Sequence, residues 1–333
     1  MKINAKNWTR LTSIPYLIIG IVIPTLVFFS PEKLLVYYFS NSNTYNTACF
    51  VKTPPKYIIM GSSMSLYGIP PIVITKTNQL IKNDVINISS NAATPLANYS
   101  MYIMNEKLLK NADIVFYSLD PWIYNEKYYK HRPYERLLWK LDQYFFMKEY
   151  LDIPDSYFSP LTKIFKNIFS NNTKCKISEH RLNNSGFIGR PAHPERLKVT
   201  PKNGFGHFIY EDLNLFGPST IQLKYIKKLK DRVEANGGVF VFVLTPRHDY
   251  AIDVYRSHPE YEKLFLEQFN KIVGETVLIG SRDMRKYKLT SNQFFDNGHL
   301  SVRGAIIYTK KEFSNIQRIH NLKPEKLKPL LQY

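Results

Sequence analysis

Residues 56–63 read KYIIMGSS, a short apolar run that ends at one glycine and two serines. An apolar run of this length, closed by a glycine, is typical of a β-strand that is buried on both faces. Four further runs have the same character, at 84–88 (DVINI), 113–119 (DIVFYSL), 238–244 (GVFVFVL) and 276–279 (TVLI). Amphipathic helical patterns separate them, at 100–110, 219–236 and 260–273. This alternation predicts an α/β fold, a three-layer sandwich with a central parallel sheet.

The N-terminal segment has the features of a membrane anchor. Residues 11–29 (LTSIPYLIIGIVIPTLVFF) contain no charge and follow Lys2, Lys6 and Arg10. About 20 apolar residues cross a bilayer, and the basic flank stays in the cytoplasm. We therefore predict a cytoplasmic tail at 1–10 and a transmembrane helix, a signal anchor, at 11–30. The rest of the chain is expected outside the cytoplasm, in the periplasm or at the cell surface. A cleaved signal peptide is the alternative, although no small-x-small cleavage site follows closely.

Changes in composition divide the remainder of the chain. A polar connector at 31–55 ends in two prolines, and the α/β domain is predicted at 56–320. Residues from about 125 to 207 break the strand–helix alternation and are rich in Tyr, Phe, Lys and Arg. We interpret them as an insertion, a lid or a substrate-facing subdomain. The Lys- and Pro-rich tail at 321–333 is expected to be a surface extension.

The charge of the chain favours an anionic partner. With 45 Lys and Arg against 27 Asp and Glu, the formal net charge is +18. Nucleic acid, lipid headgroups and anionic glycans all fit a basic protein, but a surface outside the cell excludes nucleic acid. The alternative is a genome that uses lysine often, since the lysines are scattered. Cys49 and Cys175 can form one disulfide or remain unrelated thiols.

Ser63 is the candidate nucleophile. It lies at a strand-to-helix turn, at the carboxyl edge of the predicted sheet, where α/β proteins place their sites. Gly61 allows the backbone to turn sharply, and the backbone N–H of Ser63 can point at an oxyanion. An ordinary turn is the alternative interpretation of Gly-Ser-Ser.

Asp296 and His299 form the second signal, in the stretch DNGHL at 296–300. At this spacing the carboxylate can accept a hydrogen bond from Nδ1–H of the imidazole and leave Nε2 free to face a serine. A surface turn that happens to contain a histidine is the alternative.

An early Gly-Ser-Ser and a late Asp-x-x-His, flanking an α/β pattern, resemble the SGNH (GDSL-type) hydrolase superfamily over residues 56 to 315. The resemblance implies an SGNH-hydrolase-like fold, with Ser63 as nucleophile, His299 as general base and Asp296 as its orienting partner. The N-terminal anchor and the block around Trp122 are similar to a membrane-anchored subgroup. That subgroup includes the D-alanyl transfer protein of teichoic-acid modification and exported polysaccharide O-acetylation proteins.

The middle blocks depart from the family pattern at the oxyanion hole. Ala92 stands where the family has a glycine whose N–H lines the hole, and it can still donate that N–H. Asp120 stands where an Asn side chain is expected. A carboxylate there opposes an oxyanion, so either Asn91 replaces the missing amide or the hole rests on backbone donors.

Other candidate contacts come from aromatic and histidine residues. His248 follows the most apolar strand, at the same sheet edge as Ser63, and is expected either to contact substrate or to belong to a capped loop. Trp122 begins an aromatic and basic stretch that suits a sugar or an anionic polymer, or else is a helical core with basic residues at its rim. The remaining histidines have no metal-ligand spacing, so no metal and no cofactor is predicted; they include His131, His180, His193 and His207.

These features predict an exported, membrane-anchored serine esterase or O-acyltransferase. The expected substrate is a cell-envelope or extracellular polysaccharide, attacked through a Ser-His-Asp triad and an acyl-enzyme. The alternative is a scaffold or glycan-binding protein that keeps the fold and has lost the activity. In a third reading the chain receives acyl groups from a multi-span membrane acyltransferase.

Overall fold

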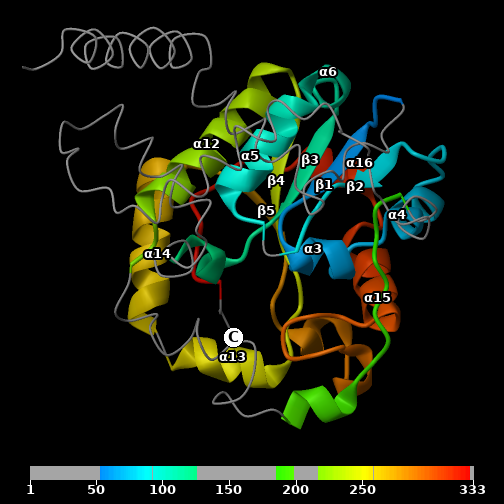
Figure 1. Ribbon diagram of the computed structural model, residues 1–333, viewed down its shortest axis with the longest axis vertical. Coiled ribbons are helices and arrows are strands. Elements are labelled where there is room, and N and C mark those ends of the chain that lie inside the picture. Colours follow the sequence, from blue (N-terminus) through cyan, green and yellow to red (C-terminus); the bar gives the residue numbers. More distant parts are fainter. Residues whose placement is uncertain (1–52, 92, 126–184, 199–216, 258, 331–333) are drawn as a thin grey trace, which may run out of the picture.

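The computed structural model describes residues 53–91, 93–125, 185–198, 217–257 and 259–330 (Figure 1). The predicted anchor, both cysteines and most of the predicted insertion lie outside these ranges. In the part of the chain that the structure describes, no helix is long and apolar enough to cross a membrane.

A five-stranded, all-parallel sheet forms the centre of the fold, as the sequence predicts. The strands are β1 (Tyr57–Met60), β2 (Val85–Asn87), β3 (Ile114–Ser118), β4 (Val239–Leu244) and β5 (Val277–Gly280). Their spatial order is β2-β1-β3-β4-β5. Successive strands are thus added on one side of β1 first and on its other side from β3 onward, so the strand order reverses between β1 and β3. In register, Tyr57 lies opposite Val85 on one side and Ile114 on the other.

Helices cover both faces of the sheet (Figure 1). One face carries α5 (Pro95–Met104), α6 (Glu106–Leu109), α12 (Thr220–Ala235) and α14 (Pro259–Ile272). The other carries α4 (Pro71–Thr77), α15 (Val302–Glu312) and α16 (Ile316–His320). The shorter elements are α3 (Ser63–Gly68), α13 (Asp249–Arg256), η2 (Pro121–Tyr124), η4 (Pro194–Lys198), η5 (Met284–Tyr287) and η6 (Ser291–Gln293).

The two cores follow the alternation of side chains along each strand. Ile58 and Val115 point into the core beneath α5, α12 and α14, whereas Ile59 and Phe116 point into the core beneath α4, α15 and α16. All four are fully buried, which explains why these strands are continuous apolar runs rather than alternating ones.

Two segments differ from the sequence expectation. The pattern at 100–110 forms two helices, because the chain leaves the helical region at Asn105 before α6 begins. The C-terminal tail, expected as a surface extension, is instead attached to α14 and β5. Leu327 and Leu330 are buried, and the Asn270 side chain both donates to and accepts from the backbone of Leu327. Glu325 forms an antiparallel bridge with Thr276.

Gly61 turns the chain from β1 into α3. Its φ of +129° is one that residues with a Cβ rarely adopt, and an added Cβ would lie 2.1 Å from Ser118 Oγ. Glycine is therefore required both for the backbone direction and for the close approach of β3.

We expect Gly61→Ala to lower the free energy of unfolding by about 3 kcal/mol or more, because strain and a steric clash add together. Gly237→Ala is the matched control, since Gly237 has φ +86° but no atom within 4 Å of an added Cβ. It should cost only about 1 kcal/mol. Urea unfolding measures both, and equal losses would contradict the proposed role of the Ser118 contact.

Candidate active site

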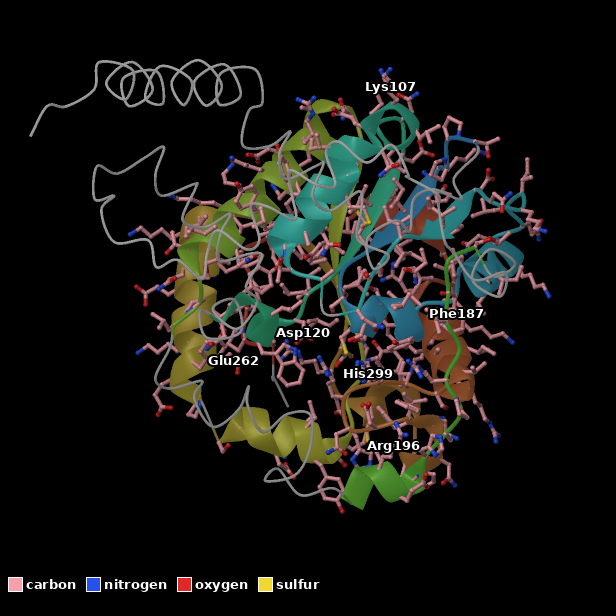
Figure 2. The ribbon with its side chains drawn as sticks, viewed as in Figure 1. Lys107, Asp120, Phe187, Arg196, Glu262 and His299 are labelled. Carbon is pink, nitrogen blue, oxygen red and sulfur yellow. The ribbon has the colours of Figure 1, made fainter. Side chains whose placement is uncertain are left out.

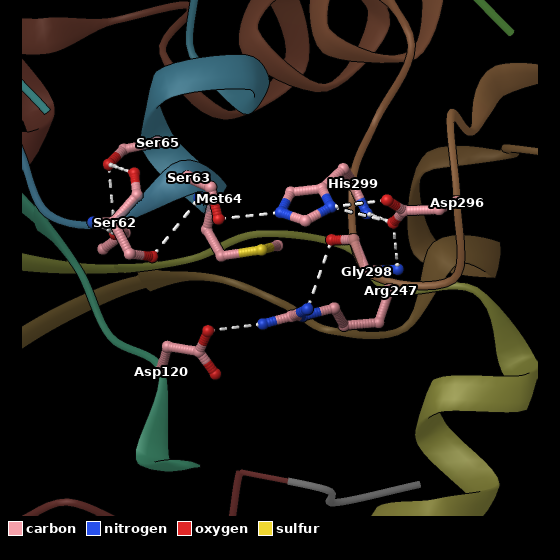
Figure 3. Close-up of polar contacts among 10 residues, drawn as sticks. Ser62, Ser63, Met64, Ser65, Asp120, Arg247, Asp296, Gly298 and His299 are labelled. Carbon is pink, nitrogen blue, oxygen red and sulfur yellow. Dashed lines mark hydrogen bonds and ion pairs between the residues drawn. The ribbon is translucent and has the colours of Figure 1, made fainter. Parts of the chain in front are cut away.

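Ser63, His299 and Asp296 form one hydrogen-bonded line (Figure 3). His299 Nε2 lies 2.8 Å from Ser63 Oγ, and His299 Nδ1 lies 2.8 Å and 2.9 Å from the two carboxylate oxygens of Asp296. A carboxylate on Nδ1 fixes the tautomer with its free lone pair on Nε2. The order of atoms is that of a nucleophile, a general base and an orienting group.

The start of α3 determines where Ser63 lies. Ser62 caps the helix, with its Oγ accepting the N–H of Met64 at 3.3 Å, so Ser63 is the first helical residue. Its side chain is partly exposed while the rest of α3 is buried. Among the described residues the backbone N–H of Ser63 has no acceptor, which leaves it available to an oxyanion.

A buried cluster of serines supports this turn from below. Ser65 Oγ lies 2.7 Å from Ser89 Oγ and 3.0 Å from Ser118 Oγ, so the cluster joins α3 to the ends of β2 and β3. Asn87 adds an amide that donates to Ser65 O and Ile69 O, at 2.8 Å and 3.1 Å. The sequence did not indicate this cluster, because single serines in a sequence carry no sign of their partners.

Asp296 stays ionised in this setting. Burial is the largest single effect and raises the pKa of Asp296, whereas the hydrogen bond and the charge of His299 lower it. The N–H groups of Gly298 and His299, each 2.8 Å from Oδ1, lower the pKa further, and the net shift is downward. The Asp-x-x-His loop thus binds its own carboxylate through backbone donors.

The structure corrects the expectation for Asp120. Its carboxylate is buried in an ion pair with Arg247, with Nη2 of the arginine 2.6 Å from Oδ2. The same guanidinium donates through Nη1 to the carbonyl of Gly298 at 3.2 Å (Figure 3). Asp120 is therefore neutralised rather than left to oppose an oxyanion, and Arg247 ties β3 and β4 to the Asp-x-x-His loop.

Trp122 and His248 are buried supports of the site in this structure. The Trp122 ring lies 4.3 Å from the Arg247 guanidinium carbon and is 9% exposed. His248 Nε2 lies 3.0 Å from Ser291 Oγ, and its backbone N–H donates to Asn297 O. Burial lowers the pKa of His248, and nearby Asp249 only partly offsets this. Of the two alternatives for His248, a substrate contact or a capped loop, these contacts favour the capped loop.

The remaining predicted oxyanion residues are Asn91 and Ala92. Ala92 lies outside the described residues. Asn91 is exposed, and its Oδ1 accepts the hydroxyl of Tyr67 at 2.6 Å, which leaves Nδ2 as a donor. The Tyr67 ring meets the His299 ring edge-on, with centroids 5.4 Å apart. Tyr67 had no signal in the sequence, although it lies four residues after Ser63 on the same helix.

No set of three or more His, Cys, Asp and Glu side chains within the described ranges could hold a metal ion. His193 pairs with Glu195 at the edge of the site, and the other insertion histidines lie outside those ranges.

In comparisons with known proteins, no family model matches the chain and no curated protein matches it. What the site can do must therefore be inferred from its geometry. A hydroxyl, a base, an orienting carboxylate and an unpaired backbone N–H at one sheet edge are the groups that acyl transfer requires.

The Asp120–Arg247 pair gives a test of coupling. We expect Asp120→Asn and Arg247→Met each to cost about 3–5 kcal/mol of stability, because each leaves one charge buried without its partner. The double variant Asp120→Asn/Arg247→Met should cost much less than the sum. Urea unfolding of the four proteins measures this, and additive losses would contradict the coupling.

The lowered pKa of Asp296 predicts a pH-dependent contribution to stability. A carboxylate with a depressed pKa stabilises the fold above its unfolded pKa of about 3.9, and the contribution is lost as pH falls through the folded value. Asp296→Asn should therefore reduce stability more at pH 7 than at pH 3. Unfolding curves at the two pH values measure the difference; a loss independent of pH would argue against the ionised carboxylate.

Proposed function

We propose that this chain is an SGNH-type serine esterase or O-acyltransferase that acts on a cell-envelope or extracellular polysaccharide. The observation that carries the proposal is the 2.8 Å contact between Ser63 Oγ and His299 Nε2, with Asp296 on the opposite ring nitrogen. The two motifs are 236 residues apart in sequence, so their meeting is not a local accident of the chain.

The chemistry follows from these contacts. His299 takes the proton of Ser63 as Oγ attacks the carbonyl carbon of an ester, and the oxygen of the tetrahedral intermediate is stabilised by N–H donors. His299 then gives the proton to the departing alcohol, which leaves an acyl group on Ser63. Water or a sugar hydroxyl attacks this acyl-enzyme, with His299 again accepting the proton. The Oγ–acyl bond then breaks, His299 returns the proton to Ser63 Oγ, and either acid or acylated sugar is released.

Two donors for the oxyanion come from the described residues. The Ser63 backbone N–H has no acceptor there, and Asn91 keeps its Nδ2 because Tyr67 occupies its Oδ1. Asn91 would replace the amide that the family places at the position of Asp120.

The topology of the sheet supports a functional site at this position. In a doubly wound sheet of order 2-1-3-4-5, ligands bind outside the carboxyl ends, where the strand order reverses. Here the reversal lies between β1 and β3, and these strands lead into Ser63 and Asp120.

Location and partners follow from the sequence. The apolar segment at 11–30 would anchor the chain with its site outside the cytoplasm, and the charge of +18 suits an anionic envelope polymer. The acyl donor would reach the site directly or from a multi-span membrane acyltransferase. The mechanism requires no cofactor.

A scaffold or glycan-binding role is the second candidate. The observation that favours it is Asp120, which removes the oxyanion amide of the family. The pairing of Asp120 with Arg247 weakens this argument for a scaffold, because the negative charge near the site is compensated.

The full-length chain should hydrolyse 4-nitrophenyl acetate, and Ser63→Ala and His299→Ala should each lower kcat by roughly 10³-fold or more, because the nucleophile or base is lost. Ser314→Ala and His320→Ala are matched controls on exposed positions far along the chain, and should retain wild-type rates. Release of 4-nitrophenol measures turnover.

Mass spectrometry of the quenched reaction should find the acetyl group on Ser63. Addition of a methyl glycoside distinguishes the two fates, since a transferase forms acetylated sugar at the expense of acetate. Equal rates in wild type, Ser63→Ala and His299→Ala would reject the enzyme and favour the scaffold.

A further inference from the structure

Arg190 lies against the candidate site, and no described carboxylate pairs with it. Its Nη2 donates to the Tyr67 hydroxyl at 3.0 Å, and its guanidinium carbon lies 4.7 Å from the centroid of the Tyr67 ring and 5.2 Å from that of Phe295. The Tyr67 ring in turn contacts His299. The guanidinium is thus one side chain removed from the base, held by two aromatic rings.

The charge of Arg190 is not compensated by any described residue. Among the described residues its side chain forms one hydrogen bond, to Tyr67, and its buried Nε has no acceptor. Arg247, the other arginine at the site, is paired with Asp120. A planar cation with unused donors beside a reaction centre is suited to an oxyanion group, which it can hold through two parallel hydrogen bonds.

The backbone around Arg190 is hydrogen-bonded to α3, which carries Ser63, and to the start of α15, three residues after His299. Val302 N–H at the start of α15 donates to Arg190 O at 2.8 Å, and Ile188 N–H donates to Leu66 O of α3 at 3.3 Å. Phe187 is buried in the same core as Leu300. Figure 2 shows this segment, with Phe187 and Arg196 labelled, running past His299. The backbone that presents Arg190 is therefore held by α3, which carries Ser63, and by the start of α15, which follows the His299 loop.

We propose that Arg190 binds an anionic group of the substrate, a carboxylate, phosphate or sulfate on its sugar portion. This inference rests on the proposed function, because the bound molecule is a substrate only if the chain is an enzyme. His299 protonates the departing alcohol, so the alcohol portion lies close to His299. Tyr67 contacts the His299 ring and Arg190 is hydrogen-bonded to Tyr67, which brings the guanidinium near that portion. The enzyme would thus select acidic or phosphorylated sugars over neutral ones.

Arg196 provides the comparison within the same cluster. It lies 4.5 Å from the centroid of the Phe295 ring, but it is exposed and forms no contact with Tyr67 among the described residues. A general preference for anions would depend on both arginines, whereas a specific subsite would depend on Arg190 alone.

The test measures binding in the full-length Ser63→Ala protein, so the result does not depend on turnover. The probes are 4-nitrophenyl β-glucuronide, which carries a carboxylate, and the neutral 4-nitrophenyl β-glucoside. Glucose 6-phosphate and glucose 6-sulfate, compared with glucose, distinguish the other anions. We expect at least one anionic probe to bind about tenfold or more tightly than its neutral counterpart, the scale of a charge-assisted hydrogen bond.

Arg190→Gln should abolish this preference and leave the affinity for the neutral probe within about twofold. Arg190→Lys should retain only part of the preference, because a lysine keeps the charge but lacks the two parallel N–H donors of a guanidinium. Arg196→Gln should retain it fully, and thermal unfolding confirms that each variant is folded.

Equal affinities for charged and neutral probes, or a preference that survives Arg190→Gln, would overturn the proposal. A parallel loss for both probes would assign Arg190 a structural role through Tyr67 and Asn91, and would overturn it as well. Failure of ester hydrolysis in the wild type would reject the enzyme without affecting the binding result.

Discussion

All five strands of the sheet run in the same direction, and this shared direction determines where the rest of the molecule can act. Parallel strands bring their carboxyl ends to one edge, and each end delivers the residue that follows it. Ser63 follows β1, Asp120 follows β3, Arg247 follows β4, and the loop with His299 comes after β5. An antiparallel sheet would have sent part of this set to the opposite edge.

Two carboxylates lie at that edge and have different partners. Asp296 is bonded to His299, whereas the charge of Asp120 is compensated by an arginine. Asp296 accepts two backbone N–H groups as well as His299, which holds its negative charge in place. Asp120 is buried against Arg247, and the same arginine binds the carbonyl of Gly298. The carboxylate that looked unfavourable in the sequence therefore belongs to the support of the Asp-x-x-His loop.

The sequence predicts those parts of the structure that local patterns encode. All five strands were predictable because each is a continuous apolar run, and Ser63, Asp296 and His299 lie in short motifs with chemical meaning. Helices of five to seven residues, such as α3, α4 and α16, are too short for a helical period to be seen. The roles of Arg247 and Arg190 depend on partners 127 and 123 residues away, and no local pattern records such contacts. The attachment of the tail through Leu327 and Leu330 was missed because two leucines among lysines and prolines do not form a pattern.

The separation between Ser63 and His299 also has a consequence for how the protein is made. Contacts between residues so distant in sequence form late, after the entropy of closing long loops has been overcome. A growing chain contains its candidate nucleophile long before it contains the histidine that would activate it, and β5 must pair with β4 before that histidine is in place. Under the proposed mechanism, Ser63 would therefore gain its base only when the native topology is complete.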